Sequence, residues 1–174
     1  MRIAHVCVTG SECTGKTTLA RDLAAHFRTV WVPEYSRAYA IAKREPLDAG
    51  DVEPIARGEM EAIDARIAEA RQLLVLDTDL VSTVVYARHY YGECPAWIER
   101  EAHVRRSDLY LLMKPDVPWV ADPQRDRPHH REEIHALFRA EITRMGSAYV
   151  EIGGGWEERF ERARLAIRPV LAVP

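Results

Sequence analysis

The chain has 174 residues, of which 47% are hydrophobic and 29% charged, and its formal net charge is −3. This size fits one domain with its own core, so we expect a single domain over residues 1–174. The slightly negative charge argues against a dedicated nucleic-acid binder. The lack of a long apolar run or a signal peptide argues against membrane insertion and export. The three cysteines lack metal-site spacing and indicate a reducing cytoplasm, whereas a homo-oligomeric state stays open.

The first candidate site lies at residues 10–17, which read GSECTGKT and fit the phosphate-binding pattern G-x-x-x-x-G-K-[ST]. An apolar strand is expected before it at residues 3–8, and an amphipathic helix after it at residues 16–27. Strand, loop and helix in this order are the context in which the pattern binds phosphates. A chance glycine-containing turn is the alternative, and the two flanking elements argue against it.

The residue types of this loop suit a phosphate ligand. Gly10 and Gly15 permit a backbone in which successive N–H groups point inward at the positive end of the helix dipole. The Lys16 ammonium is placed near the outer phosphates, and the Thr17 hydroxyl suits Mg²⁺, which prefers oxygen. The residues expected to bind the nucleotide are Gly10, Ser11, Glu12, Cys13, Thr14, Gly15, Lys16, Thr17 and Thr18.

A second strand is expected at residues 29–34, where Pro33 ends the strand pairing. The carboxyl ends of parallel strands share one edge of the sheet, so Glu34 is expected at the same edge as Lys16. Glu34 is then a candidate to bind or deprotonate a substrate hydroxyl, and a solvated residue capping the next helix is the alternative. Arg37 is a candidate to pair with Glu34 or to bind a ligand phosphate, and a surface arginine is the alternative.

A long helix is expected at residues 52–70, with Gly58 marking the close approach of a ligand or another helix. Residues 73–79 follow as LLVLDTD, an apolar strand that ends in Asp77 as a Walker B motif does. Asp77 is expected to hold Mg²⁺; an aspartate that only turns the chain is the alternative. Asp79 projects to the same side if the chain stays extended, where it would contact substrate or a second magnesium ion. An N-cap on the following helix is an equal alternative for Asp79.

The remaining chain continues the alternation of helix and strand. We expect helices at residues 80–91, 95–106, 132–145 and 156–171 and strands at residues 109–113 and 148–152. Such alternation is typical of an α/β protein with a mainly parallel sheet. Residues 115–131 combine prolines with arginines, which suits a lid that closes over phosphates; a charged surface loop is the alternative.

With these motifs in order, the chain resembles the ribosylnicotinamide kinase domain of the NadR family along nearly its whole length. The segments that carry the resemblance are residues 10–17, VPEYSR at 32–37, LDTD at 76–79 and PWVADPQR at 118–125. The resemblance implies a P-loop kinase fold whose five parallel strands have the order 2-3-1-4-5, flanked by helices. It also implies phosphate transfer from ATP, with Mg²⁺, to the 5′-hydroxyl of nicotinamide riboside, giving nicotinamide mononucleotide.

The resemblance further implies roles for particular side chains. One carboxylate would orient or deprotonate the ribose 5′-hydroxyl, another would hold ribose hydroxyls, and a lid arginine would supply charge in the transition state. The catalytic residues are then Lys16, Glu34 and Arg125, with Arg127 in reserve; Thr17 and Asp77 hold the metal; Glu34, Arg37 and Asp79 bind substrate.

The chain departs from the family pattern in three places. The best-known members carry a DNA-binding domain and an adenylyltransferase domain ahead of the kinase, and neither is expected here. The lid reads DPQR at residues 122–125 instead of Asp-Gly-x-Arg, and Glu59 follows Gly58 where glutamine is usual. Two other functions stay open. One is a kinase for another nucleoside or nucleoside monophosphate, whose phosphate Arg37 and Arg57 could bind; the other is a regulatory ATPase without an acceptor.

Overall fold

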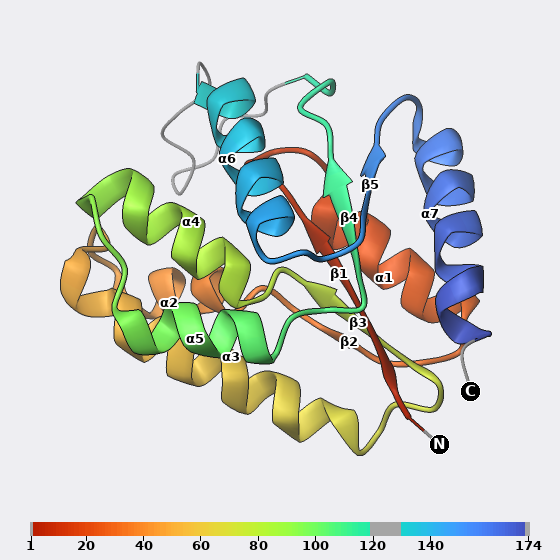
Figure 1. Cartoon of the computed structure of the whole chain (residues 1–174), viewed down its shortest axis with the longest axis horizontal. Coiled ribbons are helices and arrows are strands. Elements are labelled where there is room, and N and C mark those ends of the chain that lie inside the picture. Colours follow the sequence, from red (N-terminus) through yellow and green to blue (C-terminus); the bar gives the residue numbers. More distant parts are fainter. Residues whose placement is uncertain (1, 119–129, 173–174) are drawn as a thin grey trace.

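The computed structural model describes residues 2–118 and 130–172, and its centre is a five-stranded sheet (Figure 1). The strands are β1 (Ala4–Thr9), β2 (Trp31–Val32), β3 (Leu73–Asp77), β4 (Leu109–Met113) and β5 (Tyr149–Ile152). Every pairing is parallel and the spatial order is β2-β3-β1-β4-β5. The predicted fold class and strand order are therefore confirmed.

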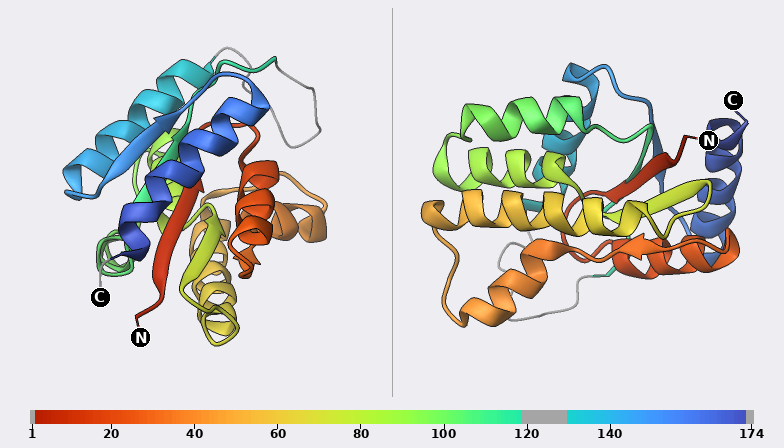
Figure 2. Two further views of the ribbon diagram at one scale, coloured as in Figure 1. Left: turned by 90° about the vertical axis from the view of Figure 1, so that its right-hand side faces the viewer. Right: turned by 90° about the horizontal axis from the view of Figure 1, so that it is seen from below.

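Helices cover both faces of the sheet, because its central strands are apolar on both sides. The helices are α1 (Lys16–His26), α2 (Tyr35–Lys43), α3 (Val52–Ile67), α4 (Leu80–Tyr91), α5 (Ala96–Val104), α6 (Arg131–Arg144) and α7 (Trp156–Leu171), with a short 3₁₀ turn at Ala49–Asp51. Figures 1 and 2 show α1 and α7 together on one face and α3, α4 and α6 on the other. Helix α5 packs on the outer side of α3 and α4.

Alternate residues of one strand enter the two cores. In β1, Val6 and Val8 pack toward α1 and α7, whereas Cys7 packs toward α3, α4 and α6. This is the period-two alternation of a strand, with both faces buried. Each fully buried aliphatic side chain contributes roughly 1.5–3 kcal/mol to stability. The two cores hold the strand ends in register, so that Val8 pairs with Asp77 at the carboxyl edge of the sheet.

Several predicted elements are shorter in the structure, and the physical reason is clear for two of them. The second strand spans Trp31–Val32 instead of residues 29–34, since Pro33 has no N–H to continue the pairing. Helix α3 ends at Ile67 instead of residue 70, because Glu69 and Ala70 donate to the carbonyls of residues three positions earlier and tighten the chain into a turn. None of the helices in the described part of the chain has the length and apolar character needed to cross a membrane.

Candidate active site

The phosphate loop connects β1 to α1 in a backbone conformation that few residues tolerate. Gly10 has φ +133°, and a Cβ there would lie 2.9 Å from the carbonyl oxygen of Met113 on β4. Gly15 has φ +85° and lies under the ring of Trp156, which a Cβ would overlap. Cys13 also has positive φ, at 55°. Left-handed residues within a turn direct successive N–H groups toward one point, which makes a nest for an anion.

Two side chains of the loop bond to its own backbone. Lys16 Nζ donates to the Ser11 carbonyl at 2.9 Å, and Thr14 Oγ1 donates to the same oxygen at 2.9 Å. Lys16 is the first residue of α1, so its ammonium lies at the positive end of that helix. The Lys16 ammonium therefore lies within the phosphate loop. An anion bound there would be stabilised by this charge and by the N–H groups of the loop.

Thr17 and Asp77 form the best candidate for a magnesium site. Thr17 Oγ1 donates to Asp77 Oδ2 at 2.6 Å across the loop from α1 to β3. Within the described residues the other oxygen, Asp77 Oδ1, is buried without a hydrogen-bond partner. Burial raises the pKa of Asp77 to about 6, although the Thr17 hydroxyl and the Lys16 charge oppose the shift. A hydroxyl and a buried carboxylate with one uncommitted oxygen fit Mg²⁺, which binds few protein ligands beside the phosphates of its substrate.

Among the residues that the structure describes, no larger metal site competes with this pair. The described ranges contain no group of three or more histidine, cysteine, aspartate or glutamate side chains placed to hold a metal ion. A zinc site would need about four such ligands. The donor set therefore favours a hard cation that is shared with a phosphate.

Glu34 follows β2 at the same edge of the sheet. It occupies the N-cap position of α2, yet its carboxylate makes no capping bond and accepts from Ser36 Oγ at 2.9 Å instead. Its charge raises the pKa of Asp77, and that of Arg37 lowers it, so both groups lie within electrostatic reach of the magnesium site. The structure thus brings Lys16, Glu34 and Asp77 to one edge, as the sequence predicted. The roles of these residues stay predictions.

Asp79 does not lie beside Asp77, because the chain does not stay extended between them. Thr78 has φ +69°, which turns the following residue into the protein. Asp79 Oδ1 accepts from the Val81 N–H at 3.0 Å, and Oδ2 accepts from Tyr110 OH at 2.8 Å. The extended chain on which projection to the same side depended is not found, and the prediction of an N-cap is confirmed. Contact with a substrate stays a prediction that this geometry does not favour, since both oxygens are already bonded.

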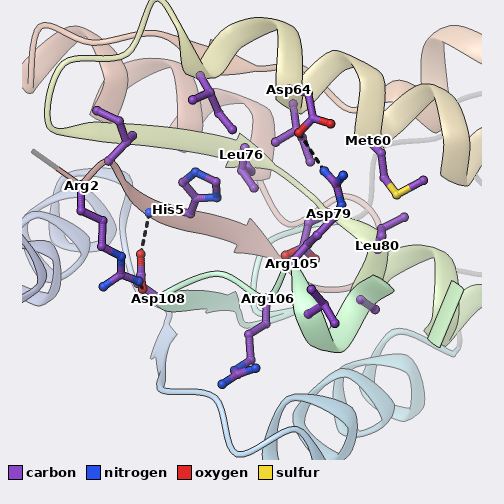
Figure 3. A pocket seen from close by; sticks show the side chains of 15 residues that line it. Arg2, His5, Met60, Asp64, Leu76, Asp79, Leu80, Arg105, Arg106 and Asp108 are labelled. Atoms are coloured by element: carbon purple, nitrogen blue, oxygen red, sulfur yellow. Dashed lines mark hydrogen bonds and ion pairs between the residues drawn. The ribbon is translucent and has the colours of Figure 1, made fainter. Parts of the chain in front are cut away.

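Asp79 also lines a cavity that is separate from the phosphate loop (Figure 3). The cavity measures about 250 Å³ and lies between α3, the end of α5 and the amino-terminal ends of β1 and β4. Its three arginines are engaged, because Arg2 pairs with Asp108, Arg105 pairs with Asp64, and Arg106 donates to the His103 carbonyl. No residue of the phosphate loop contributes to its lining. This cavity is therefore not part of the site at the carboxyl edge.

Other predicted candidates fall into three groups. Arg57 pairs with Glu53 at 3.7 Å and lies 4.6 Å above the Trp97 ring, which is a surface arrangement on α3. Gly58 marks the approach of α2, because the Tyr35 ring occupies the space that a Cβ would take.

The lid segment, residues 115–131, extends beyond the described part of the chain. Its arginines Arg125 and Arg127 lie outside the described residues.

Glu59 is a group that sequence reasoning noted but assigned no role. Its side chain is buried on α3, where Oε2 accepts from Thr83 Oγ1 at 3.1 Å and Oε1 lies 3.5 Å from Thr78 Oγ1. Burial, with smaller effects of Asp79 and Glu34, raises the pKa of Glu59 to about 8. The carboxyl is therefore protonated at neutral pH and resembles the uncharged amide of a glutamine. The departure from glutamine was the signal in the sequence.

Replacing Glu59 by glutamine is expected to stabilise the protein at alkaline pH. The pKa of Glu59 is about 8 in the folded protein against 4.5 for the free group. The folded state binds this proton more tightly than the unfolded state does. The contribution of Glu59 protonation to folding stability is therefore fully present below pH 4.5 and is lost as pH rises through about 8. Glutamine carries no such proton, so the difference in Tm between Glu59→Gln and wild type should grow from pH 5 to pH 8.5. Each kcal/mol corresponds to roughly 2–4 °C in a chain of this size.

Thermal unfolding at several pH values tests this. Glu61→Gln is the matched control, because Glu61 is an exposed glutamate on the same helix. Its Tm should follow that of wild type at every pH. A Glu59→Gln curve parallel to wild type would show that Glu59 is ionised throughout the range.

The phosphate loop, the parallel sheet and the strand-end carboxylates together define the class of protein. The chain belongs to the AAA domain family, whose model matches residues 5–159. Within that class it is similar to the Trifunctional NAD biosynthesis/regulator protein NadR of Escherichia coli (strain K12), at 32% identity over 176 residues. That similarity covers 97% of this chain and 43% of the relative, so the chain spans less than half of the relative's length.

Two solved structures agree with this placement. A NadR protein in complex with NR has a TM-score of 0.85 at 24% identity, over 99% of this chain and 52% of that one. A NadR protein in complex with NAD and AMP-PNP has a TM-score of 0.78 at 26% identity, over 99% and 50%. The resemblance drawn from the four sequence segments is thereby confirmed.

Proposed function

We propose that this chain is an ATP-dependent kinase that phosphorylates the 5′-hydroxyl of nicotinamide riboside and so serves NAD biosynthesis in the cytoplasm. The observation that carries the proposal is that a candidate site for the phosphate donor and a candidate base for the acceptor lie at the same edge of the sheet. Lys16, Thr17 and Asp77 would make the site for phosphates and Mg²⁺, and Glu34 offers a carboxylate that is not used for capping. The similarity to a NadR protein that was solved with NR supports the choice of acceptor.

In this proposal the phosphate loop holds the donor. The nest of N–H groups and the Lys16 ammonium would bind the outer phosphates of ATP and offset their negative charge. Thr17 and Asp77 would hold Mg²⁺, which neutralises charge on the phosphate oxygens when it is bound. Loss of the Lys16 charge, or of the Thr17 and Asp77 oxygens that would hold Mg²⁺, would raise the barrier, since phosphoryl transfer depends mainly on positioning and electrostatics.

Glu34 would serve the acceptor. Its carboxylate would accept the proton of the ribose 5′-hydroxyl while the hydroxyl oxygen forms a bond to the γ-phosphorus. The bond between that phosphorus and the bridging oxygen of ADP breaks in the same displacement, and ADP leaves. Ser36 Oγ bonds to Glu34 Oε1 at 2.9 Å and would keep the carboxylate oriented. Residues 115–131 are proposed as a lid, with Arg125 closing on the phosphates.

Measurement of ADP release across a panel of acceptors tests the proposal. With ATP and Mg²⁺, nicotinamide riboside should stimulate ADP release more than deoxynucleosides or nucleoside monophosphates, and the product should carry one added phosphate. Nicotinamide mononucleotide is the control acceptor, because its 5′ oxygen already carries phosphate. Greater stimulation by another nucleoside or a monophosphate would reassign the acceptor. Slow hydrolysis that no acceptor stimulates would indicate a regulatory ATPase.

A further inference from the structure

Arg159 is a buried cation that the proposed mechanism does not use. It lies in the first turn of α7, and its side chain is 1% exposed. A guanidinium withdrawn from water costs several kcal/mol unless its donors are satisfied and its charge is paired. The residues that bond to Arg159 must therefore offset the cost of its burial, and they indicate its role.

The guanidinium of Arg159 joins three loops. Nε donates to the Gly154 carbonyl at 2.7 Å in the turn after β5, and Nη1 donates to the Thr14 carbonyl of the phosphate loop at 3.1 Å. Nη2 pairs with Asp116 on the segment that leaves β4. Asp116 in turn accepts from the Gly154 N–H at 2.8 Å, which closes the network.

We propose that Arg159 is a positioning residue for the phosphate loop, which holds the loop's N–H groups in the orientation that binds the phosphates of a nucleoside di- or triphosphate. A peptide unit is planar, with its C=O and N–H pointing in opposite directions. The bond from Arg159 to the Thr14 carbonyl therefore fixes where the Gly15 N–H points. Because the carbonyl is drawn outward, toward α7, that N–H is directed into the concave side of the loop.

Two neighbouring contacts act in the same direction. Arg131, at the start of α6, lies with Nη1 3.5 Å from the Cys13 carbonyl and bonds to the Val117 carbonyl at 2.9 Å. The Trp156 ring packs on Gly15 and lies 5.4 Å from the Arg159 guanidinium. The outer side of the loop is thus held by two arginines and a tryptophan, while its inner side is left to the ligand.

The inference rests on the part of the proposed function that places nucleotide phosphates on this loop, and it is independent of the acceptor.

Arg159→Lys keeps the charge but removes the planar fork, so one ammonium cannot serve three acceptors in different directions. Calorimetric titration with ADP and Mg²⁺ should show a loss of affinity of about tenfold or more. Asp116→Asn should weaken ADP binding in the same way, and the double variant should lose less than the two single losses combined. Arg162→Lys, an exposed position on the same helix, is the matched control and should bind ADP as wild type does.

The outcomes separate this role from a purely structural one. If Arg159→Lys has a lower Tm but binds ADP as tightly as wild type, Arg159 serves stability alone and the inference is overturned. If wild type binds ADP and the double variant shows additive losses, the network does not act as a unit and the inference fails while the kinase proposal stands. If wild type itself does not bind ADP, both the inference about Arg159 and the proposed function fail.

Discussion

Lys16→Ala is expected to abolish phosphoryl transfer while the fold stays intact. The side chain lies in the phosphate loop, where its ammonium donates to the Ser11 carbonyl of that same loop. The ammonium would exchange this carbonyl for phosphate oxygens, where charge accumulates in the transition state. Removing one such donor from a preorganised site typically costs roughly 10²–10³-fold in rate, and here the donor also carries a full charge.

The steady-state rate of ADP release with nicotinamide riboside, ATP and Mg²⁺ measures this effect. Arg21→Ala is the control, because Arg21 is an exposed arginine on the same helix whose ion pair is with its neighbour Asp22. The control should keep the wild-type rate. Thermal unfolding of Lys16→Ala should stay close to wild type, since a part-buried hydrogen bond contributes only about 0.5–1.5 kcal/mol, or somewhat more when charged. Substantial remaining turnover would defeat the assignment of this loop to catalysis.

Glu34→Gln is expected to lower kcat by roughly 10²–10⁴-fold, the usual contribution of a positioned general base. Glutamine has nearly the same shape and can still accept the bond from Ser36 Oγ, so the local structure should persist. What it loses is the capacity to take a proton from the acceptor hydroxyl. ATP binding should change little, because in the proposed mechanism the phosphates are held by residues of the loop and by Mg²⁺ on Asp77 of β3.

Comparison of kcat with the Kd for ATP tests the role of Glu34. Glu45→Gln is a suitable control, since Glu45 is exposed beyond the end of α2. It should leave both quantities unchanged. Equal losses of rate and of ATP affinity in Glu34→Gln would assign Glu34 to structure or to ground-state binding instead of proton transfer.

The phosphate loop and the Walker B strand could be predicted from the sequence because their signals are local. A glycine pattern between a strand and a helix marks the loop around Lys16, although distant residues such as Arg159 also contact its backbone. Likewise, an apolar run that ends in Asp77 places that carboxylate at the end of a buried strand. The parallel sheet followed from the alternation of elements, whereas its order came from the family resemblance, because adjacency of strands depends on how the helices pack.

The sequence by itself determined the proposed donor half of the site, namely the loop, Thr17 and Asp77, since each is marked by its neighbours along the chain. Only the tertiary structure decided which way Asp79 points, because the left-handed conformation of Thr78 and the Tyr110 hydroxyl draw it into the core. It also decided the protonation of Glu59, which follows from burial between α3 and α4. Arg159 is the clearest case of a feature that could not be predicted from the sequence. Its contact with Thr14 joins residues at opposite ends of the chain, and no local pattern in an amphipathic helix marks one arginine as buried.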